Sequence, residues 1–205
     1  MPLSGVLVMI IAIVGTYDDC WLCNPMGNGK SNTMTYFGIE EKNEGKRVYA
    51  NYSIDFGEKM QILDMVDRVL TEESSGYALL IDEIQLVIDQ DLNKNLRKKF
   101  INQFVAQSRK RSANIYYTTQ RYKNVAKKLR DVTTLILWPI KRHLHAGDLI
   151  ASDPRYVCNN DTCKEPHQID VYQHIPFLPY PLVTLRPELV AKHYKSDEIV
   201  IERTV

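Results

Sequence analysis

The segment that most constrains this chain runs from Asn24 to Ser31 and reads Asn-Pro-Met-Gly-Asn-Gly-Lys-Ser. It fits the pattern G-x-x-x-x-G-K-[ST], except that Asn24 stands where the first glycine is expected. Gly27 and Gly29 let the backbone wrap closely around an anion and point its N–H groups inward. Such a loop joins a buried strand to a helix whose N-terminus favours negative charge, so it predicts an α/β fold with a phosphate site.

Two side chains of this loop have specific expected roles. Lys30 is expected to reach the β- and γ-phosphates of a nucleoside triphosphate, and Ser31 is expected to bind Mg²⁺. Asn24 replaces a glycine with a residue that tolerates unusual backbone angles better than most. ATP and Mg²⁺ are therefore the predicted cofactors. The other positions expected to surround the nucleotide are Pro25, Met26, Gly27, Asn28, Gly29 and Asn32.

Apolar runs alternate with amphipathic stretches along the chain, as in an α/β protein with a mainly parallel central sheet flanked by helices. Leu3–Val14 is too short to cross a bilayer and lacks a basic leader, so we expect a buried strand rather than a signal peptide. The other expected strands are Asp19–Cys23, Arg47–Ile54, Tyr77–Asp82, Asn114–Thr119 and Thr133–Pro139. The expected helices are Ser31–Glu40, Glu58–Thr71, Leu92–Arg111 and Tyr122–Asp131, with a polar turn at Glu41–Lys46.

The pattern loosens after Pro139. The chain has 205 residues, enough for one α/β domain with a sizeable core. We expect a single domain over residues 1–205, with a core at about 5–138 and a C-terminal elaboration at about 139–205. Within the elaboration we expect a strand at Ile169–Ile175, an extended surface segment at Pro176–Pro187, a helix at Leu189–Lys195 and an edge strand at Ile199–Glu202.

A second motif follows the loop by about fifty residues. The apolar strand Leu79-Leu80-Ile81 ends in Asp82 and Glu83, which is the pattern of a Walker B element. Asp82 would hold the water shell of Mg²⁺ opposite Ser31, and Glu83 would orient and activate the water that attacks the γ-phosphate. The alternative is a helix cap by Asp82 with Glu83 near the helix dipole. The pairing with the upstream loop favours the catalytic interpretation.

Two further polar residues are candidates for the same site. Gln120 ends the strand that begins near Asn114, and its amide could sense the γ-phosphate and touch the attacking water. Arg109 lies at the expected end of a helix and could act as an arginine finger in the site of a neighbouring subunit. The alternative is that Arg109 belongs to a basic last turn that suits the helix dipole. Arg111 and Arg130 are weaker candidates for the finger.

The charge distribution is uneven although the formal net charge is only +1. No acidic residue lies between Asp91 and Asp131, a span rich in lysine and arginine. A neutral chain with a basic middle indicates a polyanionic partner, and the alternative is an ordinary solvated helix face. The candidate DNA contacts are Lys123, Lys127 and Lys128.

The four cysteines form two close pairs, Cys20 with Cys23 and Cys158 with Cys163. The second pair spans a short polar stretch, and His167 follows it. Disulfide formation, a partial zinc site and free thiols all remain open for these residues.

These motifs together resemble the FtsK–HerA superfamily of ring-forming P-loop ATPases. The resemblance is strongest to the viral branch that pumps double-stranded DNA into capsids, including the packaging ATPases of Sulfolobus turreted icosahedral viruses. It covers roughly residues 19–138. The segments that carry it are Asn24–Ser31, Tyr49–Tyr52, Leu79–Glu83, Gln107–Arg111 and Thr118–Arg121.

The resemblance implies a RecA-like fold of the ASCE type and hydrolysis of ATP to ADP and phosphate. It assigns the nucleotide and metal to Lys30 and Ser31, the Walker B pair to Asp82 and Glu83, the sensor to Gln120 and the trans-acting finger to Arg109. It also implies four partners or settings: double-stranded viral DNA, a homo-oligomeric ring at a capsid vertex, capsid or membrane-vertex proteins, and a location in the host cytoplasm and the virion. A chain of this length is expected to be monomeric or weakly associated in isolation.

Two other functions remain compatible with a phosphate loop. One is a virion assembly or morphogenesis ATPase that does not act on DNA, as in the toxin-like P-loop proteins of filamentous phages. Its sequence mark would be an apolar span of about twenty residues. The other is a small nucleotide kinase. Glu83 and Gln120 argue against a kinase, because kinases of this type usually lack the glutamate after the Walker B aspartate.

Overall fold

The structure, a computed structural model, describes residues 9–16, 29–71, 76–85, 112–143, 167–173 and 182–194. The strands of these residues form one eight-stranded sheet. Its first six strands run parallel, and β7 lies antiparallel to both of its neighbours. The order across the sheet is β3 (Glu58–Lys59), β2 (Arg47–Ala50), β4 (Tyr77–Ile81), β5 (Ala113–Arg121), β1 (Ile10–Thr16), β6 (Leu135–His143), β7 (His167–Gln173) and β8 (Val183–Leu185).

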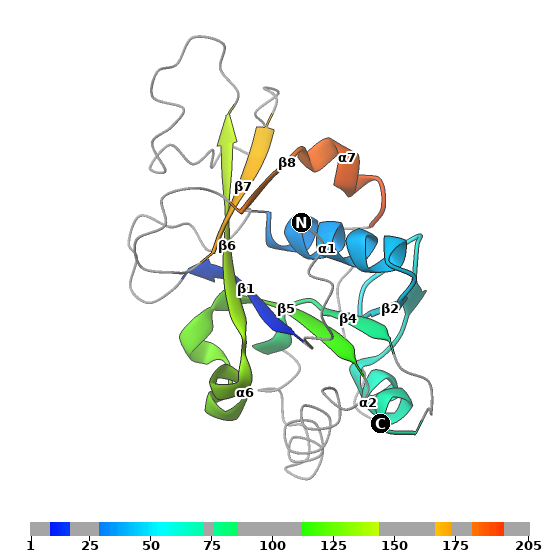
Figure 1. The fold of residues 1–205 in the computed structure, drawn as a ribbon. Coiled ribbons are helices and arrows are strands. Elements are labelled where there is room, and N and C mark those ends of the chain that lie inside the picture. Colours follow the sequence, from blue (N-terminus) through cyan, green and yellow to red (C-terminus); the bar gives the residue numbers. More distant parts are fainter. Residues whose placement is uncertain are drawn as a thin grey trace.

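Helices cover both faces of the sheet (Figure 1). α1 (Lys30–Asn43) and α7 (Pro187–Ala191) lie on one face. α2 (Ile62–Thr71) and α6 (Lys127–Val132) lie on the other, and a short 3₁₀ helix, η2 (Tyr122–Asn124), precedes α6. Both faces of the central strands are therefore buried, which explains why β1 and β4 are apolar at nearly every position.

Alternate residues of each central strand enter two separate cores. Ile10, Ala12 and Val14 of β1 pack with Leu79 of β4 on the side of α2 and α6. Ile11 and Ile13 pack toward Met34 of α1 on the other side. Because successive side chains of a strand point to opposite faces, each central strand contributes to both cores of this three-layer structure.

α1 approaches the sheet closely because of a glycine at its centre. A Cβ at Gly38 would lie 2.5 Å from Cδ1 of Leu80 in β4. Gly29, which precedes the helix, has a φ of +92°, in the left-handed region that favours glycine. A Cβ at Gly29 would lie 2.5 Å from Cδ1 of Ile169 in β7, so the C-terminal part of the chain packs directly against the phosphate loop.

Most of the strands expected from the sequence are confirmed. β1 agrees with the expected buried strand within Leu3–Val14, and β4, β5, β6 and β7 lie where apolar runs predicted them. Three expected elements, Asp19–Cys23, Leu92–Arg111 and Ile199–Glu202, fall outside the described residues.

Several boundaries were wrong. The expected strand Arg47–Ile54 ends at Ala50, and the expected helix Glu58–Thr71 begins only at Ile62, because Glu58–Lys59 form the edge strand β3. α1 continues to Asn43, through residues expected in a polar turn. The expected helix Tyr122–Asp131 is divided into η2 and α6.

The C-terminal residues also differ from expectation. Residues 135–137 of β6 pair with β1, and residues 137–143 pair with β7, so the strand continues past Pro139. Val183–Leu185 was expected in a surface segment but pairs with β7 as β8. α7 begins at Pro187 rather than Leu189. Among the described residues, no helix is long and apolar enough to span a membrane.

Candidate nucleotide site

The N-terminus of α1 meets the carboxyl end of β4 at one edge of the sheet. The Ser31 hydroxyl Oγ lies 3.1 Å from Oδ2 and 3.3 Å from Oδ1 of Asp82. Ser31 lies in the first turn of α1 and Asp82 directly follows β4, so the two side chains meet where the start of the helix lies beside the carboxyl end of this strand. The structure therefore brings the two expected metal ligands together.

The turn after β4 is fixed by Asn51, which follows the neighbouring strand β2. The Asn51 side-chain amide donates to the backbone carbonyl of Asp82 at 3.0 Å. The backbone N–H of Asp82 donates to Oδ1 of Asn51 at 2.7 Å. The Asn51 side chain thus forms hydrogen bonds with both the N–H and the C=O of Asp82, in the way that the backbone of a neighbouring strand would.

A second side chain reaches the same turn from β5 on the other side. The backbone N–H of Glu83 donates to the hydroxyl of Thr118 at 2.8 Å, and this hydroxyl donates to Oδ1 of Asp82 at 2.5 Å. Thr118 is fully buried. Side chains from both strands that flank β4 therefore hold the Asp82–Glu83 turn.

Glu83 has an unusual backbone conformation, with a φ of +51°. A non-glycine residue in the left-handed region costs about 1–2 kcal/mol. Surrounding bonds must maintain such a conformation, and it is often found at functional sites. The side chain of Glu83 accepts a hydrogen bond from the Gln85 amide.

Lys30 is buried beside the two acids, with only 7 % of its surface exposed. Burial lowers the pKa of Lys30 below its usual value, and the negative charges of Glu83 and Asp82 oppose this shift without cancelling it. The lysine that the motif assigns to phosphates therefore lies in a desolvated position next to the Walker B pair, where a bound anion would favour its charged form.

Two buried polar atoms close to this site, Oδ1 of Asn32 and Oε1 of Gln85, have no hydrogen-bond partner among the described residues. A buried unpaired acceptor is uncommon in proteins. Asn32 is one of the residues that the sequence assigned to the nucleotide.

Gln120 lies two residues beyond Thr118 in β5. The alternation of the strand places both on the side of the sheet that α1 covers. Gln120 is half-buried at the carboxyl end of the strand, next to the residue Arg121 that pairs with Thr16 of β1. It is thus at the expected edge of the sheet. The predicted residues Asn24, Pro25, Met26, Gly27, Asn28 and Arg109 lie outside the described residues.

His193 and Tyr194, which follow α7, pack beside this site. The Tyr52 hydroxyl is 2.9 Å from that of Thr35 in α1, and Tyr194 makes an edge-on contact with the Tyr52 ring. Burial, together with the charge of Asp82, raises the pKa of Tyr194 to about 12. The His193 ring lies 2.9 Å from the Asp55 carboxylate, which fastens these residues to the loop after β2.

The donor set fits Mg²⁺. A serine hydroxyl and a carboxylate lie side by side, and Mg²⁺ prefers oxygen ligands of this kind together with phosphate and water. Among the residues that the structure describes, no group of three or more histidine, cysteine or acidic side chains could hold another metal. All four cysteines lie outside those residues.

No protein-family model matches the sequence, and a comparison with curated protein sequences finds no match. The fold is similar to that of the N-terminal domain of zonular occludens toxin from Neisseria meningitidis, with a TM-score of 0.52 and 15% identity, covering 92% of this chain and 100% of that one. It is also similar, with a TM-score of 0.43 and 14% identity, to the genome packaging NTPase B204 from Sulfolobus turreted icosahedral virus 2 in complex with AMP, covering 83% and 98%. A third neighbour is the flagellar accessory protein FlaH from Methanocaldococcus jannaschii, with a TM-score of 0.42 and 10% identity, covering 81% and 77%.

At these identities the comparisons concern the fold. The chain has an α/β fold with a mainly parallel central sheet flanked by helices, similar to the fold of the toxin domain. The Gly-Lys-Ser sequence follows β1, a central strand that lies between β5 and β6, and β4, which precedes Asp82 and Glu83, lies on the far side of β5. The α/β architecture predicted from the sequence is confirmed.

Sequence reasoning missed three residues that contact the Walker B turn. Asn51 and Thr118 lay in segments that carried the resemblance but had no assigned role, and Gln85 had none either. Asn51 and Gln85 follow the ends of buried strands, and Thr118 lies near the carboxyl end of β5. A polar residue in such a position could have been identified from the sequence as a site candidate, because α/β folds bind ligands at the carboxyl ends of parallel strands.

Proposed function

We propose that this protein is an ATP-hydrolysing motor that moves double-stranded viral DNA into a preformed capsid. The observation that carries the nucleotide part is the gathering of Lys30, Ser31, Asp82 and Glu83 at one edge of the sheet. The resemblance to packaging ATPases supports the DNA part, and so does the basic surface described below.

In this proposal each residue of the site has one task. Lys30 neutralises the β- and γ-phosphates, and Ser31 and Asp82 hold Mg²⁺, which neutralises charge on the phosphates when bound. Glu83 orients the attacking water and accepts its proton. Gln120 contacts the γ-phosphate or this water. Most of the catalysis of phosphoryl transfer comes from such positioning and charge stabilisation.

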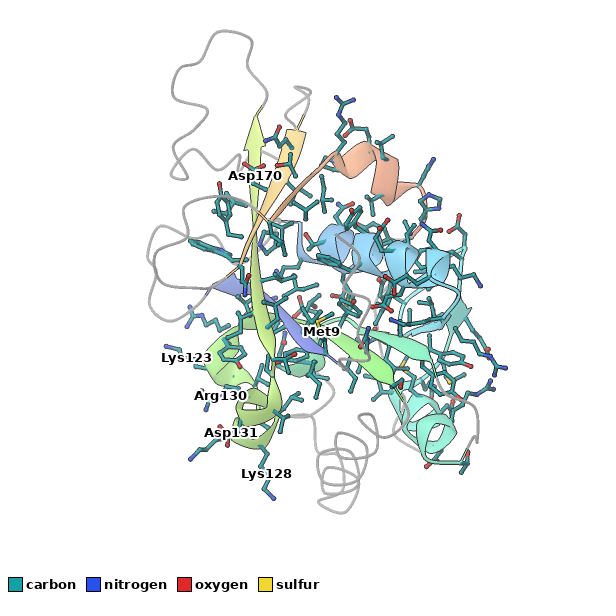
Figure 2. All side chains as sticks on the ribbon, in the orientation of Figure 1. Met9, Lys123, Lys128, Arg130, Asp131 and Asp170 are labelled. Atoms are coloured by element: carbon teal, nitrogen blue, oxygen red, sulfur yellow. The ribbon has the colours of Figure 1, made fainter. Side chains whose placement is uncertain are left out.

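The proposed DNA contacts lie on η2 and α6. Lys123, Lys127 and Lys128 are exposed, and Figure 2 shows Lys123 and Lys128 pointing away from the body of the protein. η2 directly follows the carboxyl end of β5, which carries Gln120. Hydrolysis could thus be coupled to movement of this surface. Contacts of lysine to phosphate are insensitive to sequence and weaken with salt.

Hydrolysis and DNA binding can be tested together. Phosphate release is measured with and without duplex DNA of mixed sequence. We expect DNA to stimulate turnover, and replacement of Lys123, Lys127 and Lys128 by glutamine to weaken DNA binding and flatten its salt dependence. A variant with Lys42, Lys59 and Lys192 replaced by glutamine loses the same charge elsewhere and should bind DNA as the wild type does. Phosphorylation of an acceptor molecule instead of phosphate release would contradict the proposal.

Arg109 is proposed to complete the site of a neighbouring subunit. Its replacement by alanine should impair hydrolysis only in the assembled ring. The test compares wild type and Arg109→Ala at a capsid vertex and at high dilution. If a dilute monomer hydrolyses ATP and Arg109→Ala abolishes that activity, the residue acts within its own chain and the trans role is wrong.

A virion assembly ATPase that does not act on DNA is the second candidate. The similarity of fold to the zonular occludens toxin domain brings this candidate forward, although at 15% identity it concerns the fold alone. This candidate predicts hydrolysis that duplex DNA leaves unchanged. The stimulation experiment therefore separates the two functions.

A further inference from the structure

Thr118 of β5 forms hydrogen bonds to both Asp82 and Glu83. Its hydroxyl accepts the backbone N–H of Glu83 and donates to the carboxylate of Asp82, at 2.8 and 2.5 Å. A single buried hydroxyl therefore fixes one backbone group and one side chain of the same turn. No other threonine hydroxyl with a recorded hydrogen bond in the described residues contacts either acid.

These two bonds act on the features that hydrolysis would need. The bond to Oδ1 restricts the rotation of the Asp82 carboxylate that faces Ser31. The bond from the Glu83 N–H stabilises a residue that has a φ of +51°. Without this bond, the turn would lose part of what maintains the left-handed conformation, and the Glu83 carboxylate would change its direction.

We propose that Thr118 is a positioning residue that holds Asp82 toward the metal site and Glu83 toward the attacking water. The inference rests on the proposed hydrolysis of ATP. Thr118 touches neither nucleotide nor water in this proposal, and it acts through the two acids. Because Gln120 follows on the same side of β5, movement of this strand shifts the sensor and the Walker B turn together.

The test compares four proteins: wild type, Thr118→Val, Thr118→Ser and Thr119→Val. Valine keeps the shape of threonine and removes the hydroxyl, whereas serine restores it. Thr119 is the matched control, because it is equally buried in the same strand and its hydroxyl donates to the carbonyl of Arg121 on the other face. Each protein is measured for kcat, for KM of ATP and for the Mg²⁺ concentration at half activity.

We expect Thr118→Val to lower kcat about tenfold or more with KM changed less than about threefold, because positioning matters mainly in the transition state. Its half-activity Mg²⁺ concentration should rise. Thr118→Ser should recover most of the rate, and Thr119→Val should keep it. Equal losses of kcat in Thr118→Val and Thr119→Val would overturn the proposal, since both would then reflect only a lost buried hydroxyl. If Thr118→Val does not fold, Thr118→Ala replaces it.

Amide hydrogen exchange at Glu83 provides a readout that needs no turnover. Loss of the Thr118 hydroxyl should accelerate this exchange about tenfold or more, whereas Thr119→Val should leave it unchanged. Unchanged exchange at Glu83 in Thr118→Val would overturn the positioning role. If the wild type hydrolyses no ATP but exchange accelerates in Thr118→Val alone, the proposed function fails while the role of Thr118 in holding the turn stands.

Discussion

Two carboxylates lie at opposite ends of α1, and both are held by side chains of β5. Near the N-terminus of the helix, Asp82 meets Ser31 and Thr118. Near its C-terminus, Glu41 accepts hydrogen bonds from the Asn114 amide at 2.7 Å and the Tyr116 hydroxyl at 2.5 Å. Asn114, Tyr116 and Thr118 are alternate residues of one strand, so one polar row of β5 serves both acids.

The two ends differ in what neutralises the carboxylate. Glu41 is 5 % exposed and forms an ion pair with Lys46, which follows it in the chain. Burial lowers the pKa of Lys46, but hydrogen bonding and charge attraction from Glu41 and Glu44 outweigh this and raise it overall. Asp82 is half-buried, its recorded hydrogen bonds come from the hydroxyls of Ser31 and Thr118, and the buried Lys30 lies nearby. A carboxylate bonded directly to an enclosed cation stabilises the fold, whereas one whose recorded hydrogen bonds come from hydroxyls can still accept a metal.

The largest expected effect is on activity, at the Asp82 end. Glu83→Gln should lower ATP turnover about a hundredfold or more, because the amide cannot accept the proton of the attacking water. ATP binding should persist, since Lys30 and the loop are unchanged. Phosphate release and fluorescence titration with an ATP analogue measure the two quantities. Turnover equal to wild type would remove Glu83 as the base.

The next effect is on stability, at the Glu41 end. Glu41→Gln should lower the free energy of unfolding by about 2–3 kcal/mol, because the paired charge is lost and the amide donors face other donors. Nucleotide affinity should change less than about threefold. Glu44→Gln is the control: Glu44 also pairs with Lys46, but its side chain is 61% exposed and should contribute less than about 1 kcal/mol. Urea unfolding measures both. Equal losses would mean that burial does not distinguish the two acids.

Lys46→Met should lower the free energy of unfolding by about 1–2 kcal/mol at neutral pH, because Glu41 remains buried without its cation. The pKa of Lys46 is higher in the folded protein than its usual value of 10.5, so its contribution is complete below that pH. It is lost as pH rises through the folded value. The difference between wild type and Lys46→Met should thus be constant from neutral pH to about pH 10 and shrink above it. A difference that grows with pH would contradict this assignment.

The smallest effect is expected at an exposed carboxylate. Asp55 bonds to the ring of His193, and the Asp55 side chain is 58% exposed. Asp55→Asn should lower the free energy of unfolding by less than about 1 kcal/mol, with the loss decreasing in high salt. Unfolding at two salt concentrations measures it. A loss as large as that of Glu41→Gln would show that exposure does not rank these three acids.

Local patterns in the sequence predicted the elements that carry the site. The continuous apolar run of β4 predicts a buried strand, and the Gly-Lys-Ser sequence predicts a phosphate loop. Neither prediction requires knowledge of distant residues. β3 was missed because two residues give no periodicity, and β8 because nearby prolines favour an extended surface segment.

Residues whose role depends on strand order could not be assigned in this way. Asn51 and Thr118 reach the Asp82–Glu83 turn because β2 and β5 flank β4, and no local pattern contains that arrangement. Glu41 was expected in a polar turn because it is charged. It is buried because Asn114 and Tyr116, more than seventy residues away in the chain, lie opposite it. A buried polar residue whose hydrogen-bond partners are distant in the sequence looks like a surface residue when only its sequence neighbours are considered.

Gly29 and Ile169 are packed together in the folded protein but are synthesised at different times. A ribosome releases the phosphate loop long before it releases β7, because a chain emerges from its N-terminus. During that interval the glycine lacks the side chain that packs over it in the finished protein. The residue that packs on Gly29 is therefore synthesised after all the motif residues. A shortened chain that ends near residue 138 would keep every motif residue and permanently lack the side chain that packs on Gly29.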